Sequence, residues 1–218
     1  MYEIVVFDLD GTLLDTLQDL ADAVNFSLVK NDKKKRTVAE VKSFVGNGVR
    51  NLMQKALGEE HIDILDKAVA DFFEYYSVHS ADKTKPYEGM ISLLAELQKR
   101  NIKTAVLSNK PDKATKQLAE RFFEGLFTEV MGENESLGIR KKPAPDALFA
   151  LLERQGVKKE NALYVGDSEV DIQTAKNAGV SCVSVTWGFK DREFLLQNGA
   201  TLLVDKAMDI LKVIEVKQ

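Results

Sequence analysis

The sequence predicts an α/β protein with a Rossmann-like parallel sheet core, helices on both faces of the sheet and an inserted α-helical domain. Two observations support this prediction. Short apolar runs alternate with longer amphipathic stretches, which is the pattern of strand–helix–strand crossovers in a parallel sheet. The alternation is interrupted once, over residues 16–85, where every periodic segment is helical. We therefore expect a core made of residues 1–15 and 86–218 and a helical insert at 16–85.

The strands of the core are expected at six short apolar runs. Burial on both faces of a sheet favours such runs, because neither face alternates with solvent. The runs lie at residues 4–7, 103–107, 129–131, 162–165, 181–185 and 202–204. The amphipathic stretches between them predict helices at residues 91–100, 113–123, 147–155 and 172–177.

The insert contains apolar residues at helical spacing and a helix-start pattern. Thr37 and Glu40 have the spacing of a capping box, in which each side chain bonds the other residue's backbone N–H. Four helices are expected, over residues 17–28, from residue 37, over 49–57 and over 64–76. A helical module inserted after the first strand is the simplest arrangement.

The composition is that of a soluble globular protein. The chain has 218 residues, of which 44% are hydrophobic and 29% charged, and its net charge is -4. This charge creates no field that would recruit nucleic acid or an anionic membrane. No run approaches the ~20 apolar residues of a membrane span. The single cysteine, Cys182, rules out a disulfide framework, so we expect a cytoplasmic protein.

Two carboxylates follow the first strand. Asp8 and Asp10 lie on one side of the extended chain, and Gly11 allows a sharp turn immediately afterwards. Paired carboxylates are costly without a cation or proton between them. A simple strand end running into an Asp-Gly turn is the alternative interpretation.

Polar residues also follow two later segments of the core. Ser108 and Asn109 end the second strand, where a hydroxyl and backbone N–H groups can face an anion at a helix start. They could equally cap that helix. Lys142 is held in extended backbone by Pro143 and could neutralise a phosphate or the Asp8 carboxylate. A solvated loop is the alternative for this lysine.

The fourth strand adds two carboxylates, Asp167 and Asp171, although Asp171 could merely favour a helix N-terminus. Ligands bind at the carboxyl ends of strands in open α/β sheets, so these groups should converge. Oxygen ligands of this kind suit Mg²⁺ together with a phosphate. The two histidines, His61 and His79, lie in the insert, which argues against zinc. The residues therefore predict a phosphoryl-transfer site.

The chain resembles the haloacid dehalogenase superfamily. Four motifs carry the resemblance in order: Asp8-Leu9-Asp10-Gly11-Thr12, Ser108 with Asn109, Lys142 with Pro143, and Gly166-Asp167 through Asp171. The insert is similar to the family's small helical cap. Within the superfamily the chain most resembles the phosphoglycolate phosphatases, through Ser108-Asn109-Lys110-Pro111 and the segment Val45-Gly46-Asn47-Gly48-Val49.

The resemblance implies a role for each motif residue. Asp8 would be the nucleophile that forms an aspartyl-phosphate, and Asp10 the general acid and then base. Ser108 and Lys142 would complete the catalytic set. The implied ligands of Mg²⁺ are Asp8, Asp10 through its carbonyl, Asp167 and, as a weaker candidate, Asp171.

Substrate contacts are expected from Thr12 and Asn109 in the core and from Gly48 and Arg50 in the insert. Arg50 could pair with a substrate carboxylate, or it could be an ordinary exposed arginine. The segment Trp187-Gly188-Phe189 could line the mouth of the site or pack at the sheet edge.

We expect a Mg²⁺-dependent phosphatase for a small phosphorylated metabolite, with 2-phosphoglycolate as a plausible substrate. A sugar-phosphate mutase similar to β-phosphoglucomutase and a pyrophosphatase share the same catalytic residues and stay as alternatives. A phosphorylated receiver or silent interaction protein is disfavoured, because Asp10 is present and no motif residue is missing. The expected partner is a small phosphate ester, with the protein a monomer or homodimer.

Overall fold

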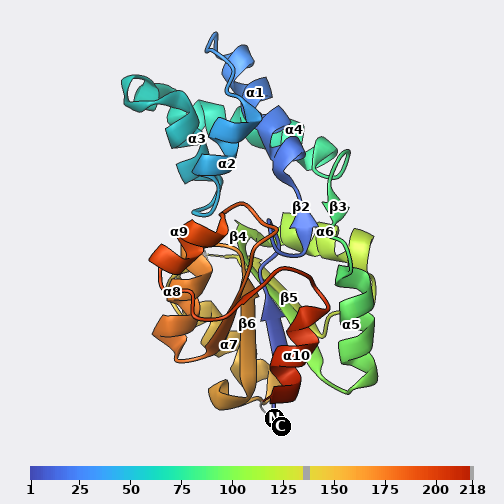
Figure 1. Cartoon of the computed structure of the whole chain (residues 1–218). Coiled ribbons are helices and arrows are strands. Elements are labelled where there is room, and N and C mark those ends of the chain that lie inside the picture. Colours follow the sequence, from blue (N-terminus) through green and yellow to red (C-terminus); the bar gives the residue numbers. More distant parts are fainter. Residues whose placement is uncertain (135–137, 217–218) are drawn as a thin grey trace. The chain divides into compact units, whose positions relative to one another are not determined.

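The computed structural model describes residues 1–134 and 138–216, and the chain divides into two compact units (Figure 1). The core unit comprises Met1–Leu14 and Pro86–Gln218, and the helical unit comprises Asp15–Lys85. The boundaries expected from the sequence differ from these only in assigning Asp15 to the core. Within the described residues, no helix has the length and apolar character needed to cross a bilayer.

A six-stranded parallel sheet forms the centre of the core unit. Its strands, in spatial order, are β5 (Glu129–Glu133), β4 (Lys103–Pro111), β1 (Ile4–Phe7), β6 (Ala162–Gly166), β7 (Ser181–Val185) and β8 (Leu203–Val204). Every pairing between neighbours is parallel. The six runs predicted from the sequence are thus confirmed as the strands of this sheet.

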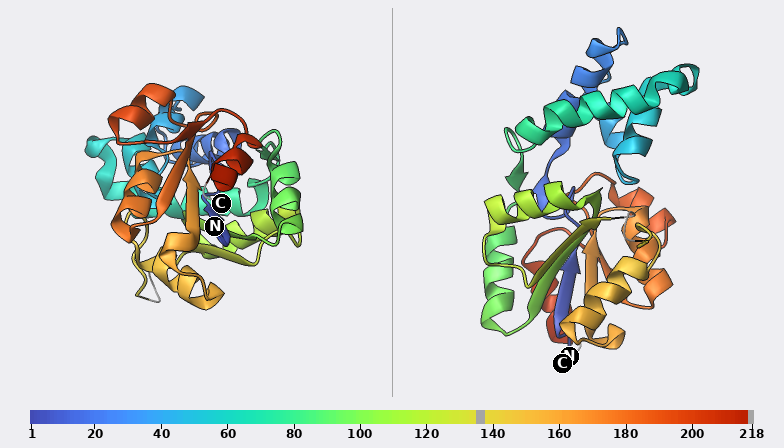
Figure 2. Two further views of the ribbon diagram at one scale, coloured as in Figure 1. Left: turned by 60° about the horizontal axis from the view of Figure 1, so that its bottom comes forward. Right: turned by 180° about the vertical axis from the view of Figure 1, so that it is seen from behind.

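Helices cover both faces of the sheet. They are α5 (Met90–Lys99), α6 (Asp112–Phe123), α7 (Asp146–Gln155), α8 (Glu169–Ala178), α9 (Arg192–Gln197) and α10 (Asp209–Val216). Ile4 and Val6 of β1 pack in one apolar cluster with α7 and α8. Side chains alternate along a strand, so Val5 and Phe7 face the opposite side. Figures 1 and 2 show α7 and α10 on opposite faces.

The central position of β1 determines which side chains can meet. β1 pairs with β4 on one side and β6 on the other, and all four of its residues are fully buried. The three strands are parallel, so their carboxyl ends lie at the same edge. Asp8 and Asp167, which follow β1 and β6, and Ser108, near the carboxyl end of β4, are therefore brought to one edge of the sheet.

The helical unit has an apolar core of its own. Its helices are α1 (Leu17–Lys30), α2 (Val38–Phe44), α3 (Val49–Leu57) and α4 (Leu65–His79), with a short 3-10 helix at Glu59–Ile64. The predicted capping box is present at α2: Glu40 N–H donates to Thr37 Oγ1 at 3.2 Å, and Thr37 N–H donates to Glu40 Oε2 at 2.7 Å. β2 (Leu14–Asp15) and β3 (Lys85–Pro86) form a two-stranded sheet that the sequence did not predict.

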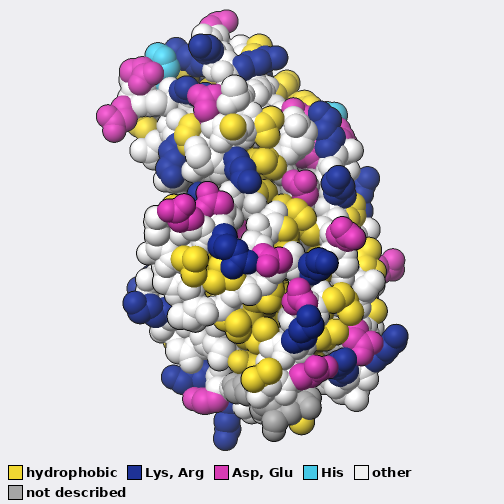
Figure 3. Space-filling view, viewed as in Figure 1, with side chains coloured by type: hydrophobic (Ala, Val, Ile, Leu, Met, Phe, Trp, Pro, Cys, Tyr) yellow, Lys and Arg dark blue, Asp and Glu magenta, His cyan; other side chains and the backbone are white. Residues whose placement is uncertain are grey.

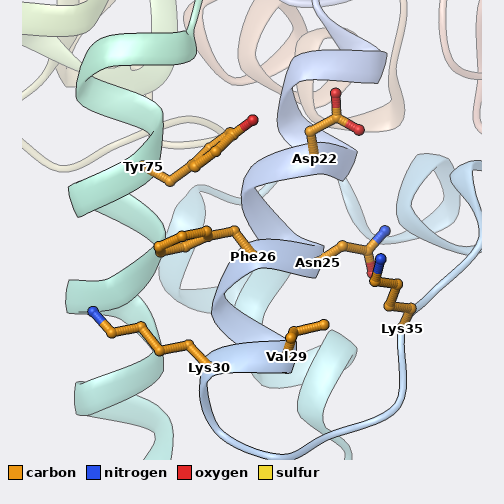
Figure 4. Close-up of a pocket in the computed structure, with 7 residues that line it drawn as sticks. All are labelled: Asp22, Asn25, Phe26, Val29, Lys30, Lys35 and Tyr75. Atoms are coloured by element: carbon orange, nitrogen blue, oxygen red, sulfur yellow. The ribbon is translucent and has the colours of Figure 1, made fainter.

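A pocket of about 560 Å³ opens within the helical unit between α1, α4 and the residues after α1 (Figure 4). Phe26 stacks on Tyr75 there, with ring centroids 4.9 Å apart. The Lys30 ammonium pairs with Asp71 and Glu74. Neither Gly48 nor Arg50 lines this pocket, so it is separate from the predicted substrate contacts.

Candidate active site

Three buried carboxylates meet at the carboxyl edge of the sheet. Asp8 follows β1, Asp167 follows β6, and Asp171 lies in the first turn of α8. They are 8%, 1% and 1% exposed, and each offers an oxygen that lies within 4.8 Å of the other two. Burying like charges together is unfavourable unless a cation compensates them or a proton neutralises one of them. The cluster is therefore stabilised by positive charge from the protein or a metal ion, or by protonation.

Lys142 supplies part of that charge. Its ammonium lies 2.9 Å from Asp8 Oδ1 and 2.7 Å from Asp171 Oδ1, and it donates a hydrogen bond to Tyr164 Oη at 3.1 Å. The side chain is only 3% exposed. The lysine that the sequence singled out beside Pro143 thus lies between two of the predicted carboxylates.

Burial changes the proton affinities of these groups. It raises the pKa of Asp8 to about 7, although the nearby Lys142 ammonium acts in the opposite direction. Burial likewise raises the pKa of Asp167 well above its ordinary value. Burial alone would lower the pKa of Lys142, but the carboxylates of Asp171 and Asp8 outweigh it and raise that pKa. Lys142 is therefore a permanent cation at neutral pH.

Asp171 is engaged through both oxygens. Its Oδ1 accepts from Lys142 and from the Tyr164 hydroxyl, the latter at 3.2 Å. Its Oδ2 accepts from Ser168 N–H at 3.2 Å and from Ser168 Oγ at 2.6 Å. Asp171 thus has the contacts of a residue that holds Lys142 in place. Its expected role as a metal ligand stays a prediction.

Asp167 also accepts a hydrogen bond at each oxygen. Thr12 Oγ1 donates to Oδ1 at 3.2 Å, and Phe189 N–H donates to Oδ2 at 2.7 Å. Thr12 was expected to contact substrate, and in the structure its hydroxyl orients this carboxylate. The substrate contact of Thr12 is still a prediction.

Asp10 is paired with Lys110, a residue that the sequence analysis did not select for the site. The Lys110 ammonium lies 3.0 Å from Asp10 Oδ1 and 2.9 Å from Oδ2, and the Lys110 side chain is 3% exposed. Lys110 precedes Pro111 just as Lys142 precedes Pro143. The same restriction of the residue before proline could have identified it.

Ser108 and Asn109 lie near the carboxyl end of β4 and are buried. Ser108 Oγ accepts from Lys110 N–H at 3.3 Å. Asn109 bonds the backbone of Lys142 in both directions: its amide donates to Lys142 O at 3.0 Å, and its oxygen accepts from Lys142 N–H at 2.9 Å. Asn109 therefore anchors the segment that carries Lys142. Its expected substrate contact stays a prediction.

The two predicted residues of the helical unit lie at the start of α3. Gly48 precedes the helix with φ 82°, and Arg50 is in its first turn. The Arg50 guanidinium forms an exposed ion pair with Asp66 of α4. This pairing matches the alternative of an ordinary surface arginine, and the carboxylate-binding role is still a prediction.

The residues fit a hard divalent cation. The candidate donors are carboxylate oxygens from Asp8, Asp167 and Asp171, without sulfur or imidazole in the group. Such a donor set suits Mg²⁺ or Mn²⁺ rather than zinc. A cation there would also offset the like charges that the burial of these carboxylates brings together.

Comparison with known proteins shows which family the chain resembles. A family model described as haloacid dehalogenase-like hydrolase matches residues 5–185. Phosphoglycolate phosphatase of Pseudomonas putida is 34% identical over 214 residues, which cover 95% of this chain and 78% of that protein. Phosphoglycolate phosphatase 1 of Pseudomonas aeruginosa is 33% identical over the same shares.

Solved structures share the fold over nearly the whole length. A crystal structure from Lactobacillus delbrueckii subsp. bulgaricus, described as "putative phosphoglycolate phosphatase", has a TM-score of 0.87 and 35% identity and covers 98% of both chains. A structure of a predicted phosphoglycolate phosphatase from Haemophilus somnus has a TM-score of 0.90 and 29% identity, again over 98% of both chains.

Proposed function

The chain belongs to the haloacid dehalogenase-like hydrolases and is a phosphatase of that family, and we propose that it hydrolyses 2-phosphoglycolate through an aspartyl-phosphate on Asp8. The observation that carries this proposal is the contact of Asp8 with Lys142 inside a buried carboxylate cluster. A carboxylate beside a fixed cation is placed to attack an electrophilic phosphorus.

The reaction runs in two displacements. A carboxylate oxygen of Asp8 attacks phosphorus, the bond from phosphorus to the substrate oxygen breaks, and Asp10 donates a proton to that oxygen. Water then attacks phosphorus, Asp10 takes a proton from it, and the bond between Asp8 and phosphorus breaks to release phosphate. Covalent catalysis divides one difficult hydrolysis into two easier steps.

Mg²⁺ would be held by the carboxylates of Asp8 and Asp167 and by the main-chain carbonyl of Asp10, with Asp171 as a further candidate. When bound, the ion supplies charge neutralisation between the nucleophile and the phosphoryl group. Lys142 contributes a second, fixed positive charge at Asp8, and Asp171 and Asn109 keep it there. Ser108 and adjacent backbone N–H groups would bind phosphoryl oxygens.

Lys110 and Asp10 form the acid–base part of the site. The ammonium bonds both carboxylate oxygens of Asp10 and holds the side chain in one orientation. In the reaction, Asp10 must carry a proton on an oxygen turned toward the leaving group, and an anionic substrate gives the Lys110 ammonium a second partner, which frees one Asp10 oxygen to take up that proton. Lys110 is thereby placed to orient Asp10 as the ester binds.

The proposed substrate rests on the relatives, which carry the name phosphoglycolate phosphatase at 34% and 33% identity over 95% of this chain. The helical unit would act as a cap over the site. In that arrangement Arg50 would exchange its exposed contact with Asp66 for the substrate carboxylate. An exposed ion pair contributes little, so giving it up costs little.

The test is a hydrolysis panel in the presence of Mg²⁺ with 2-phosphoglycolate, sugar monophosphates and pyrophosphate, in which phosphate release is measured. We expect 2-phosphoglycolate to have the highest kcat/KM. The Asp8→Asn variant should lose at least about 10³-fold in kcat, because it lacks the nucleophile.

The matched control is Asp205→Asn, which removes an exposed carboxylate that pairs with Arg192 outside the site. Its rate should equal that of the unchanged protein. An Asp8→Asn variant with undiminished turnover would exclude the covalent mechanism. Preferential conversion of a sugar monophosphate to its isomer would instead favour a mutase.

A further inference from the structure

The segment that follows β7, Trp187-Gly188-Phe189, lies directly against the Asp167 carboxylate. Phe189 N–H donates to Asp167 Oδ2 at 2.7 Å, and the Trp187 indole N–H donates to the carbonyl of Thr12 at 3.1 Å. Thr12 Oγ1 in turn donates to Asp167 Oδ1 at 3.2 Å. These three hydrogen bonds form a closed ring that joins the loop after β1, the end of β6 and the loop after β7.

Gly188 allows this close approach. A Cβ at position 188 would overlap the Cβ and Oδ2 of Asp167 and the carbonyl oxygen of Gly11, at separations that real Cβ atoms do not show. A Cβ at Gly11 would overlap the same carboxylate. The Asp167 side chain therefore lies against two glycines, and it is 1% exposed. A side chain at position 188 requires Asp167 or the Gly11 backbone to shift.

We propose that Trp187, Gly188 and Phe189 are positioning residues that fix the Asp167 carboxylate for a divalent cation. The proposal rests on the proposed function, in which Asp167 is a metal ligand. Each oxygen of Asp167 accepts one protein hydrogen bond, so the carboxylate has one rotamer and one orientation. Groups that orient a metal ligand in this way commonly change metal affinity when they are replaced.

The arrangement assigns a defined role to a segment for which the sequence left two possibilities. Packing at the sheet edge would require only apolar contacts from Trp187 and Phe189. The structure instead shows a backbone N–H and an indole N–H directed at Asp167 and at the residue that bonds it. Trp187 also lies near Tyr87, with ring centroids 6.4 Å apart. The aromatic contact can therefore be kept while the hydrogen bond is removed.

The experiment measures Mg²⁺ binding to the full chain by isothermal titration calorimetry, without substrate. Gly188→Ala should raise the Kd for Mg²⁺ about 10- to 100-fold, because the added methyl group displaces Asp167. Trp187→Phe retains an aromatic ring beside Tyr87 but loses the indole donor, so its Kd should rise about fivefold. The melting temperature in EDTA is recorded for each variant, to separate metal affinity from stability.

The control is Thr186→Val in the same segment. Its hydroxyl bonds Asp205 and Val204 O and does not contact Asp167, so the Kd for Mg²⁺ should not change. If Gly188→Ala does not fold, Trp187→Phe decides the question. An unchanged Kd in the folded variants overturns the proposal.

The two proposals fail in distinguishable ways, because the titration contains no substrate. If the unchanged protein binds no Mg²⁺, the metal site of the proposed function is wrong, and the positioning role is overturned with it. If it binds Mg²⁺ and hydrolyses none of the esters, the phosphatase assay alone has failed, and the Kd values of the variants still decide the positioning role.

Discussion

Asp8 and Asp171 share the Lys142 ammonium, and their remaining contacts separate their roles. Asp171 accepts three further hydrogen bonds from Ser168 and Tyr164, which use both of its oxygens. Asp8 is the more exposed of the two, at 8% against 1%. A nucleophile must be reachable by its substrate, whereas a residue that orients a lysine need not be. Under the proposed mechanism, the two aspartates therefore have different roles because their neighbours differ.

The first prediction concerns Asp8 in metal-free protein. Burial raises its pKa to about 7, whereas a carboxyl of this kind titrates near 3.9 in an unfolded chain. Between these values the folded state binds more protons than the unfolded state, so the free energy of unfolding falls as pH rises. The melting temperature in EDTA should therefore fall by several degrees from pH 5 to pH 7.5.

Asp8→Asn removes this titration, and its melting temperature should fall less over the same range. Part of the slope should persist, because the pKa of Asp167 is raised by burial in the same direction. Differential scanning calorimetry of both proteins in EDTA provides the comparison. Equal slopes in the two proteins would contradict the assignment to Asp8.

The second prediction concerns Lys110. If it orients Asp10 as general acid, Lys110→Met should affect poor leaving groups most. Proton transfer by a positioned group contributes about 10²- to 10⁴-fold, so loss of its orientation should lower kcat/KM for ethyl phosphate about tenfold or more. p-Nitrophenyl phosphate needs little protonation of its leaving group and should lose much less.

Both esters carry the same phosphate group and no carboxylate, so weaker anchoring of the substrate anion would lower both rates alike. Lys110→Arg should restore part of the rate for ethyl phosphate. The control is Lys116→Met, which removes an exposed ammonium that pairs with Asp112 in α6. Losses of equal size with both esters would show that Lys110 does not act through Asp10.

The sequence predicted those site residues that are polar and directly follow a buried strand. Asp8 and Asp167 were expected at one sheet edge because both directly follow buried strands. Tyr164 was not, because an aromatic residue inside an apolar strand has the pattern of an ordinary core residue. The Phe189 N–H could not be predicted either, since a backbone donor has no residue-type signature.

At the scale of elements, the sequence predicted those helices and strands that are long enough to show an apolar pattern. Helices α5 to α8 lie where the pattern predicted them because each repeats an apolar face, and the six strands lie at the predicted sites because each is a short apolar run. α9 has six residues and completes fewer than two turns. α10 has only eight residues, in which apolar and partly β-branched residues are separated by single charged ones, and a pattern this short does not distinguish helix from strand. β2 and β3 have two residues each and contain no apolar run, so the sequence did not indicate them as strands.

At the scale of the whole molecule, charged surface residues and buried apolar residues are distributed differently. Acidic and basic side chains are interspersed over the face drawn in Figure 3, in keeping with a net charge of -4. The buried apolar residues, by contrast, form separate clusters, one in the helical unit and others in the core unit. A unit with its own apolar core can lose its structure independently.

The last prediction uses this separation. Asp19 of α1 is 2% exposed and accepts hydrogen bonds from Lys83 N–H, Thr84 N–H and Thr84 Oγ1, all within the helical unit. Asp19→Ala leaves these donors without their acceptor and should cost about 3 kcal/mol. Asp22→Ala removes a more exposed ion pair with Lys83 from the same helix and should cost less than about 1 kcal/mol.

Urea unfolding followed by two probes tests whether this loss is confined to the helical unit. Trp187 is the only tryptophan, so its fluorescence reports on the core unit, whereas far-UV circular dichroism reports on both units. In Asp19→Ala the dichroism should begin to fall at a lower urea concentration than in Asp22→Ala. The fluorescence midpoint should be the same in the two variants. Coincident transitions that shift together would instead mean that the two units unfold as one, since a single cooperative transition gives every probe the same midpoint.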